Sequence, residues 1–388
     1  MPLLRGCSAL VIRCFKRVEH FADWITGAAG PVFVFLCWTL IIGGGIAFFD
    51  VVGRSLSLIQ ALILSPILII VPLNLYGQYW LVTHVPPGYP SPRAIALSPD
   101  KPISTKKEEQ WIMRDQRSLW RPERWGLGRR GRVLTRGPEP AGPSGPQVGG
   151  RRLKKCRKCD GPKPERAHHC SVCKRCILMM DHHCPWINGC VGIYNQRHFV
   201  LFMTWISIAC WCVVALGYDH FWSSLLYNQK WPAYTPRIAF TLIYVLCIAM
   251  GIAVPVLLSW HIHMITKGET SIESHDNAYL DNRASAEGLI YLNPYNMGRK
   301  QNLLLFFNIA PSGYPRITLL FPLLIPPASN GWSFPRRALP EPVVGETQVL
   351  QAPELAARSA ELGEIRGRYV MGDEGLTDDE EGGAGYMD

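Results

Sequence analysis

Cysteine and histidine side chains are concentrated in one short segment of this 388-residue chain. Seven of its 13 cysteines lie between Cys156 and Cys190. Aligned with itself at an offset of fourteen residues, the segment shows two interleaved copies of the pattern Cys-x2-Cys-x9-His-x6-Cys. The first copy consists of Cys156, Cys159, His169 and Cys176, and the second of Cys170, Cys173, His183 and Cys190. Three thiolates and one imidazole are the ligands of a closed tetrahedral zinc site, so the pattern predicts two structural Zn2+ ions.

The eight ligands could also be divided sequentially between the two sites. Only interleaving gives both sites the same spacing, which favours the interleaved assignment. A segment this short, with few large apolar residues, needs the metal in order to fold. We therefore expect residues 153–198 to form a loop-rich domain held by two zinc ions.

This assignment leaves one cysteine of the segment without a metal. It is Cys184, which closely follows Asp181 and His182. Two zinc clusters and a histidine nearby favour the thiolate, the reactive form of cysteine. His182 is then a candidate base, and Asp181 could fix its tautomer and support the imidazolium. The alternative is a spare structural thiol with incidental neighbours.

Four long apolar runs flank this segment in the chain. They span residues 31–52, 58–81, 199–222 and 238–264. Each is longer than the roughly 20 residues needed to cross the hydrocarbon of a bilayer, and four such runs make buried helices of a soluble protein a poor alternative. We expect an all-α polytopic membrane protein, with four transmembrane helices and the two-zinc domain between the second and the third. His261 and His263 end the fourth run; they could form a metal or proton site, but we interpret them as interfacial histidines.

Basic residues set the expected orientation. The formal net charge is +10, and the excess of Lys and Arg lies before residue 200. The short loops 53–57 and 223–237 carry only Arg54, Lys230 and Arg237. The positive-inside rule therefore places the N-terminus, the 82–198 loop and the C-terminus in the cytosol. Cysteines this dense on the reducing side of the membrane favour metal binding over disulfides.

The remaining segments are more polar than the four runs. We expect residues 1–30 to be a cytosolic N-terminus and residues 82–152 a basic linker rich in Pro and Gly. Residues 265–327 form a cytosolic C-terminal region. Residues 328–388 are interpreted as a disordered acidic tail.

The spacing Cys-x2-Cys-x9-His-Cys-x2-Cys-x2-Cys-x4-Asp-His-His-Cys-x5-Cys resembles the cysteine-rich domain of the DHHC-family protein S-acyltransferases, or palmitoyltransferases. The similarity continues through Pro185, Trp186, Asn188, Gly192, Asn195 and Phe199. Thr270-Ser271-Ile272-Glu273 resembles the family's Thr-Thr-x-Glu motif, and Asn293-Pro294-Tyr295-Asn296-Met297-Gly298 resembles its C-terminal box. Pro86-Pro87-Gly88 stands where the family has Asp-Pro-Gly. Ser271 replaces a threonine but keeps the hydroxyl, so we expect a hydrogen bond from it toward Asp181.

The resemblance implies an enzyme with a two-step reaction. Cys184 would take a long-chain acyl group, palmitoyl, from acyl-CoA and pass it to a cysteine of a second protein. His182 would take the proton of each attacking thiol, with Asp181 orienting it. The implied partners are acyl-CoA, the lipid bilayer and membrane-associated proteins with cytosolic cysteines, and the implied location is the endoplasmic reticulum or the Golgi.

Basic residues of the cysteine-rich segment are available for the phosphates of CoA. They are Lys154, Lys155, Arg157, Lys158, Lys174 and Arg175. For most of them, a solvated positive face is the simpler interpretation.

Three other functions compete with acyl transfer. In a non-catalytic, zinc-containing membrane adaptor Cys184 would be idle, but Asp181 and His182 beside the one unliganded cysteine argue against it. A nucleic-acid-binding zinc finger would use the positive charge, yet four spans and the lack of a recognition-helix pattern after the ligands exclude nucleic acid as the expected partner. Zinc hydrolysis needs an open metal position, whereas four protein ligands close each site.

Overall fold

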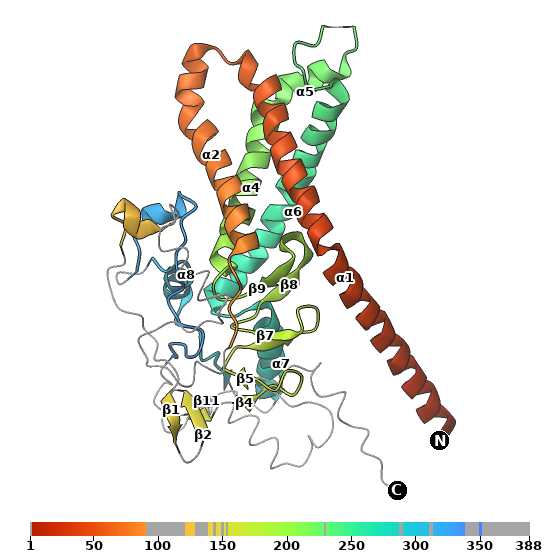
Figure 1. Ribbon diagram of the computed structural model, residues 1–388, viewed down its shortest axis with the longest axis vertical. Helices are drawn as coiled ribbons and strands as arrows, with labels where there is room; N and C mark the ends of the chain where they lie inside the picture. Colours follow the sequence, from red (N-terminus) through yellow and green to blue (C-terminus); the bar gives the residue numbers. More distant parts are fainter. Residues whose placement is uncertain are drawn as a thin grey trace.

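Four long helices form the frame of the molecule (Figure 1). The computed structural model describes residues 2–90, 121–128, 139–142, 145–148, 151–152, 154–228, 230–286, 290–309, 313–337 and 349–350. The long helices are α1 (Pro2–Val51), α2 (Leu58–His84), α4 (Gln196–Leu216) and α6 (Arg237–Lys267). All four are long and apolar enough to cross a membrane. The expected all-α architecture, with four candidate spans and the cysteine-rich segment between the second and third, is confirmed, and the structure adds short strands to it.

The largest differences from the expected helix ends are at the start of the first helix and the end of the third. The helix α1 begins at Pro2, so the segment 1–30 is largely helical and continuous with the first span. The third run was expected to continue to residue 222, but α4 ends at Leu216 and a short helix, α5 (Tyr218–Leu225), follows. Gly217 separates the two helices, and a Cβ at this position would lie only 2.6 Å from the carbonyl oxygen of Val213.

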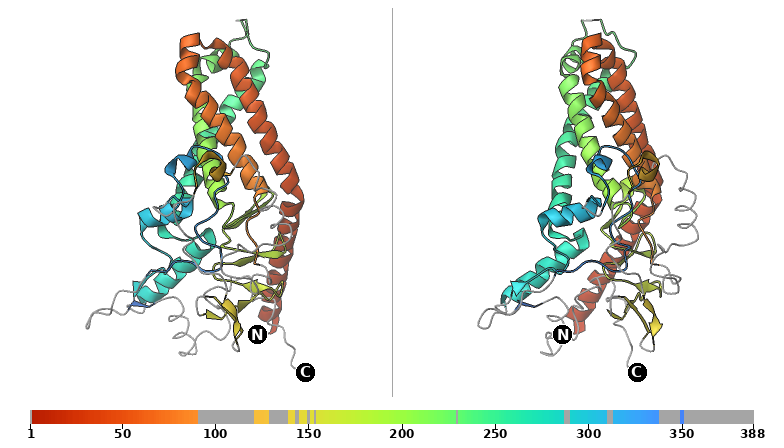
Figure 2. Two further views of the ribbon diagram at one scale, coloured as in Figure 1. Left: turned by 60° about the vertical axis from the view of Figure 1, so that its left-hand side comes forward. Right: turned by 90° about the vertical axis from the view of Figure 1, so that its left-hand side faces the viewer.

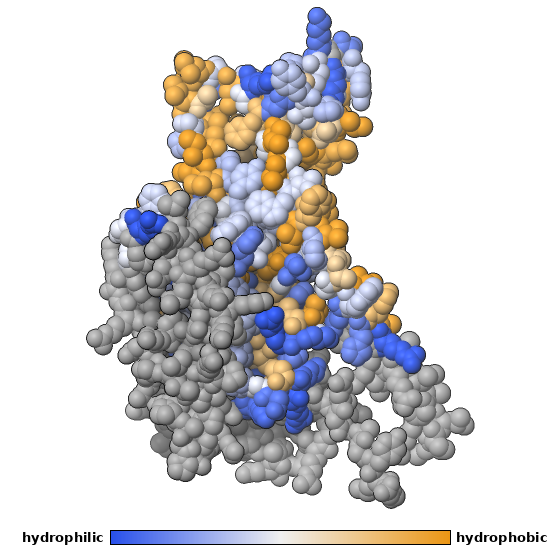
Figure 3. Space-filling model, in the orientation of Figure 1, coloured by the Kyte–Doolittle hydropathy of each residue, from blue (hydrophilic) through white to orange (hydrophobic). Residues whose placement is uncertain are grey.

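The helix α4 packs against both α2 and α6, which makes it the central helix of the bundle (Figure 2). Its buried side chains include Phe199, Phe202 and Met203, and they join Leu75 and Tyr79 of α2 in one apolar cluster. On the outside of the bundle many large apolar side chains are exposed, and they appear as orange patches over the helices on the face shown in Figure 3. An apolar outer surface is what lipid-facing helices require.

The cysteine-rich segment folds into three small antiparallel hairpins. Their strands are β4 (Lys154–Lys155) with β5 (Pro162–Lys163), β6 (His168–Cys170) with β7 (Arg175–Ile177), and β8 (His182–Cys184) with β9 (Gly189–Val191). Strands of two or three residues form too few ladder hydrogen bonds to be stable alone. The hairpins therefore depend on other interactions, and the cysteines lie where these could act.

Other short elements complete the described part of the chain. The 3-10 helices are η1 (Gly53–Ser55), η4 (Pro122–Trp125), η5 (Pro185–Ile187) and η6 (Arg316–Leu319). The remaining strands are β1 (Glu139–Gly142), β2 (Gly145–Val148), β3 (Arg151–Arg152), β10 (Ile290–Tyr291) and β11 (Val349–Leu350). The strands β1, β2 and β3 form a small sheet within the segment expected to be a linker. The rest of the 91–152 linker lies outside the described residues.

The C-terminal region carries α7 (Ser271–Ala286) and α8 (Arg299–Phe307), which lie below the bundle on the side of the hairpins (Figure 1). The expectation of a disordered tail from residue 328 is wrong for residues 328–337. Trp332 is among the most buried side chains of the molecule, and the guanidinium of Arg336 pairs with Glu165 of the cysteine-rich segment. These ten residues include the aromatic side chains of Trp332 and Phe334, which pack against the rest of the protein. The acidic residues that follow lie outside the described ones.

Candidate active site and metal clusters

The first cluster brings together Cys156, Cys159, His169 and Cys176. The Sγ atoms of Cys159 and Cys176 are 3.5 Å apart. The Nδ1 atom of His169 lies 3.6 Å from Sγ of Cys156 and 3.9 Å from Sγ of Cys176. Cys159 is exposed, so this cluster reaches the protein surface.

The second cluster brings together Cys170, Cys173, His183 and Cys190. The Nδ1 atom of His183 lies 3.7, 3.3 and 3.5 Å from the sulfurs of Cys170, Cys173 and Cys190. The sulfurs of Cys173 and Cys190 are 3.5 Å apart. Cys170 and Cys190 are buried.

Both clusters have the geometry of a tetrahedral metal site. With Zn–S bonds of about 2.3 Å and Zn–N bonds of about 2.0–2.1 Å, tetrahedral angles separate neighbouring ligand atoms by roughly 3.5–3.8 Å. The observed separations of 3.3 to 3.9 Å lie within about 0.2 Å of this range. The clusters could thus bind zinc, and the structure groups their residues in the interleaved manner and not sequentially.

The remaining thiol of the segment, Cys184, lies at the end of β8. In the β8–β9 hairpin His183 pairs with Cys190, and the next pair along the ladder is Cys184 with Gly189. A residue pair of the second cluster is therefore the direct neighbour of Cys184. The Cys184 side chain is buried, and it packs in the apolar cluster formed by α2 and α4.

Asp181 and His182 stand beside Cys184 as a hydrogen-bonded pair. The Nδ1 atom of His182 donates to Oδ2 of Asp181 at 2.7 Å. Burial by itself disfavours the imidazolium, but the hydrogen bond to Asp181 and the interaction with Cys184 raise the pKa of His182 to about 9. Burial likewise favours a protonated Asp181, yet its partner His182 and the backbone N–H of Ser271 hold the Asp181 pKa below its usual value. With Nδ1 bound to Asp181, Nε2 of His182 is the nitrogen left for the thiol.

The start of α7 fixes the carboxylate from the other side. The backbone N–H of Ser271 donates to Oδ1 of Asp181 at 2.7 Å. We expect the Ser271 hydroxyl to form a hydrogen bond toward Asp181. It does so with the main chain of Asp181, donating to the carbonyl oxygen at 2.6 Å and not to the carboxylate. Two residues further on, Glu273 accepts two hydrogen bonds of 2.6 Å from the buried guanidinium of Arg166.

The C-terminal box packs on this same arginine. The Arg166 guanidinium lies over the ring of Tyr295, with its carbon 4.4 Å from the ring centre. Asn302 donates to the carbonyl oxygen of Thr266, near the end of α6. The motif at the start of α7 thus contacts the cysteine-rich segment. The region of the C-terminal box contacts both that segment, at Arg166, and the end of α6, at Thr266.

His261 belongs to this neighbourhood, which the sequence did not indicate. Its Nδ1 atom lies 3.7 Å from Oδ2 of Asp181. Its ring centre lies 5.7 Å from that of His182. The only signal was a histidine within an apolar run, which we interpreted as interfacial; its neighbour His263 is exposed and fits that interpretation.

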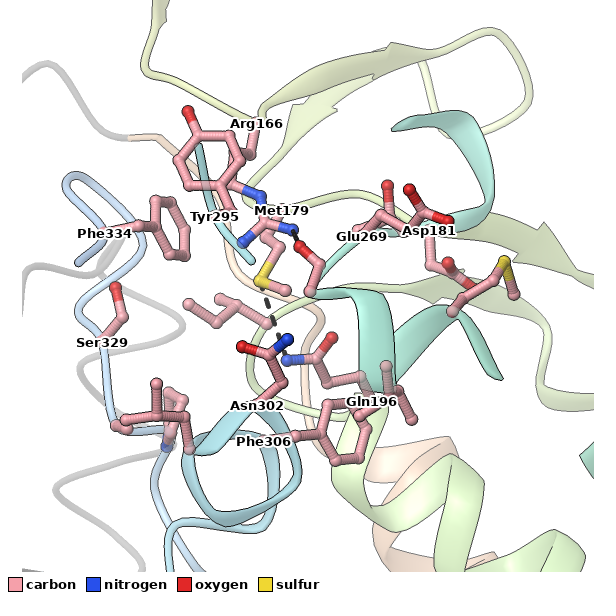
Figure 4. Close-up of a pocket in the computed structure, with 18 of the residues that line it drawn as sticks. Arg166, Met179, Asp181, Gln196, Glu269, Tyr295, Asn302, Phe306, Ser329 and Phe334 are labelled. Carbon is pink, nitrogen blue, oxygen red and sulfur yellow. Dashed lines mark hydrogen bonds between the residues drawn. The ribbon is translucent and has the colours of Figure 1, made fainter. Parts of the chain in front are cut away.

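One cavity borders the site, and a second lies within the helix bundle. One lies beside Asp181 and His261 and is lined mainly by apolar side chains, with Gln196 and Asn302 among its polar ones (Figure 4). The other is almost entirely apolar and lies between α1, α2, α4 and α6. Five side chains line this second cavity and also belong to the apolar cluster around Cys184: Ile41, Leu75, Tyr76, Ile206 and Ala209.

Comparison with known proteins identifies the segment that carries these groups. Residues 150–278 match the family model described as DHHC palmitoyltransferase. The chain carries a DHHC palmitoyltransferase domain. This DHHC domain includes both cysteine clusters, Asp181, His182, Cys184, the helices α4 and α6 and the first half of α7.

Curated palmitoyltransferases share this domain with the chain. Palmitoyltransferase ZDHHC16A of Danio rerio is 31% identical over 223 residues, which are 45% of this chain and 57% of that protein. Palmitoyltransferase ZDHHC16 of Mus musculus is 38% identical over 189 residues, 46% of this chain and 52% of that protein. Probable protein S-acyltransferase 16 of Arabidopsis thaliana is 37% identical over 153 residues, 39% of this chain and 54% of that protein. The chain thus spans about half the length of these relatives.

Proposed function

We propose that this chain is a protein S-acyltransferase. It moves a long-chain fatty acyl group, palmitoyl, from acyl-CoA to cysteine thiols of membrane-associated proteins, through an acyl-enzyme on Cys184. One observation carries the proposal: Cys184 is the cysteine of the DHHC domain that belongs to neither cluster, and it adjoins the hydrogen-bonded pair of His182 and Asp181.

The first step forms the acyl-enzyme. The Cys184 thiolate attacks the carbonyl carbon of the acyl-CoA thioester, a new C–S bond forms, and the bond to the CoA sulfur breaks. The proton that Cys184 gave to His182 passes to the departing CoA thiolate. The Asp181 carboxylate stabilises the imidazolium while His182 holds the proton.

The second step mirrors the first. A cysteine thiol of the acceptor protein loses its proton to His182 and attacks the acyl carbon on Cys184. The bond to Cys184 breaks, and Cys184 leaves as a thiolate, ready for another acyl-CoA. One thioester is exchanged for another in each step, so the enzyme supplies mainly proximity and a reactive thiolate.

We propose that the apolar cavity between the four long helices takes the acyl chain. The five side chains that it shares with the Cys184 cluster support a continuous apolar path from the thiol into the bundle. An acyl chain of about sixteen carbons gains roughly 0.8 kcal/mol for each CH2 group that leaves water, so such a path favours long chains. The exposed Lys154, Arg157 and Lys158 of the first hairpin support an approach of the CoA phosphates from the cytosolic side, although most of this charge could equally be a solvated positive face.

We further propose that each cluster holds one structural Zn2+ ion, which would fix the hairpins and take no part in the chemistry. Four protein ligands in each cluster support this role. The N- and C-termini are placed in the cytosol on the strength of the basic segments beside the first two spans. The resemblance of the motifs around Thr270 and Asn293 supports the endoplasmic reticulum or the Golgi as the location.

Acyl labelling of the detergent-purified protein tests the function. Wild type should incorporate label from palmitoyl-CoA in a form that hydroxylamine removes, whereas Cys184→Ser should not. Equal labelling of both proteins would contradict the acyl-enzyme and favour a non-catalytic membrane adaptor. His263→Ala is the control, because His263 is exposed near the C-terminal end of α6 and its loss should leave labelling unchanged.

A further inference from the structure

His261 is a buried histidine that the proposed reaction does not use. It lies near the C-terminal end of α6 and is only 8% exposed. Its Nδ1 atom is 3.7 Å from Oδ2 of Asp181, which is too far for a hydrogen bond. Within the described part of the chain His261 forms no hydrogen bond, so its place beside the carboxylate needs another explanation.

Ring contacts connect His261 to the reacting histidine. The ring of Phe199 stands edge-on to His182, with centres 5.3 Å apart, and edge-on to His261, with centres 5.4 Å apart. The rings of His182 and His261 are 5.7 Å apart and tilted by 40°. Phe199 comes from α4 and His261 from α6, so both long helices touch the imidazole of His182.

The imidazole of His182 needs such support. It is carried by a strand of three residues, and its side chain remains 33% exposed. Its hydrogen bond to Asp181 fixes the position of Nδ1, but this one bond does not fix the orientation of the ring plane. The carboxylate itself is held by Ser271 only at Oδ1, while Oδ2 faces both histidines.

We propose that His261 is a positioning residue of the acyl-transfer site. It confines the His182 ring and the Oδ2 atom of Asp181 from the bundle side, so that Nε2 of His182 stays directed at Cys184. The inference rests on the proposed function of Asp181, His182 and Cys184. A misplacement of about 1 Å in such a site costs on the order of 100-fold in rate, so a side chain that touches no substrate can matter.

The cavity in Figure 4 offers a direct way to test this role. Asp181, Phe199 and His261 all line it. Truncation of His261 to alanine would therefore leave an imidazole-sized space that opens into an existing cavity. Added imidazole can enter this space and restore the lost ring, whereas a general loss of packing elsewhere would not respond to it.

The experiment compares the single-turnover rate of acyl-enzyme formation in wild type, His261→Ala and His263→Ala. His263 lies on the same helix two residues away, is exposed, and packs near Trp260, away from Asp181. We expect His261→Ala to lower the maximal rate by about 10- to 100-fold with less than about a twofold change in the acyl-CoA concentration for half-maximal rate. His263→Ala should react as wild type does. Added imidazole should restore at least part of the rate in His261→Ala and should not change the rate of the other two proteins.

A double-mutant cycle decides whether His261 acts through the pair. In an Asp181→Ala background the additional His261→Ala change should cost less than about twofold, because the group that it positions is gone. Full additivity of the two effects would overturn the proposal, as would an unchanged rate in His261→Ala or a rate that imidazole does not restore. If His261→Ala fails to retain two zinc ions per chain, the cycle is repeated with His261→Gln, which keeps most of the volume.

The two hypotheses fail in different ways. If wild type itself forms no hydroxylamine-labile acyl-enzyme, the proposed function is wrong. If wild type is labelled and Cys184→Ser is not, but His261→Ala is labelled as fast as wild type, only the role of His261 is wrong.

Discussion

The two cysteine clusters share one ligand set and one spacing, yet their surroundings differ. The first cluster reaches the surface through the exposed Cys159. The second is built around the buried Cys170 and Cys190, and the side chain of Ile272 packs against them. Equal ligands therefore do not imply equal roles, because the burial of a cluster decides how much of the fold depends on it.

The attachments of the clusters to the helices differ as well. Asn195, just before α4, donates to the carbonyl oxygen of Cys190 and accepts from the N–H of Gly192. This ties the second cluster directly to the central helix of the bundle. The loop of the first cluster is tied to α7 by an ion pair, between Arg166 and Glu273. We infer that the second cluster positions Cys184 and that the first supports it from a distance.

Cys190→Ala should give the largest effect. Cys190 is buried beside the β8–β9 pair that carries Cys184, so water cannot take the place of the lost ligand. Because a structural zinc site contributes on the order of 10 kcal/mol to the folding of its segment, we expect acyl-enzyme formation to fall below detection. The rate of acyl labelling and the zinc content of the purified protein check this. Retention of more than a tenth of the wild-type rate would contradict the role given to the second cluster.

Glu273→Gln should have the next largest effect. It leaves the guanidinium of Arg166, which is only 6% exposed, without its charged partner. Loss of one partner of a buried ion pair costs about 3–5 kcal/mol, so the apparent melting temperature in detergent should fall by several degrees. Asp160→Asn is the control, because its ion pair with Lys155 is exposed and its loss should leave the melting temperature unchanged. Equal shifts in the two variants would show that the first cluster is not anchored through α7.

Cys159→Ala should have a moderate effect and separates the two clusters most directly. Water can reach the exposed position of Cys159 and become the fourth ligand, as it does in zinc sites with three protein ligands. Loss of an outer-shell partner already weakens metal binding by about 10- to 100-fold, so we expect loss of this direct ligand to weaken it by at least about 100-fold and the labelling rate to fall by about tenfold. Competition with a chelator and the labelling rate measure the two quantities. If Cys159→Ala is as inactive as Cys190→Ala, the two clusters are equivalent and the comparison fails.

Ser271→Ala should have the smallest effect. It removes the hydroxyl that donates to the carbonyl oxygen of Asp181 but keeps the backbone N–H that holds the carboxylate. Such a hydrogen bond contributes about 1 kcal/mol, so the labelling rate should fall by no more than about fivefold. Ser271→Thr retains the hydroxyl and should react as wild type does. A loss in both variants would point to a steric cause and not to the hydrogen bond.

The metal clusters and the four long helices could be predicted from the sequence because each depends on local spacing. Ligand intervals such as the one between Cys156 and Cys159 repeat within the segment. A membrane-spanning helix can be recognised from the length of its apolar run alone. Helix ends are less certain, since a single residue such as Gly217 ended α4 inside an apolar run. The place of residues 328–337 could not be predicted, because their order depends on distant partners such as Glu165.

The neighbours of Asp181 and His182 show the same limit. Asp181, His182 and Cys184 are adjacent in the chain, and their proximity needs no knowledge of the fold. His261 meets Asp181, and Glu273 meets Arg166, only because α6 and α7 return to the hairpins, and no spacing rule relates these pairs. The side chains that bind the α7 motif to the cysteine-rich segment were therefore accessible only from the three-dimensional structure.

Trp332 has a consequence for how natural variants of this chain should be interpreted. It lies well beyond residue 278, where the family domain ends, yet only 2% of its surface is exposed. Twelve residues before it in the chain, the carbonyl oxygen of Leu320 accepts a hydrogen bond from Asn74 in the second long helix. A substitution of Trp332 should be scored as a change in the protein interior, although domain boundaries alone would class it as a change in a peripheral extension.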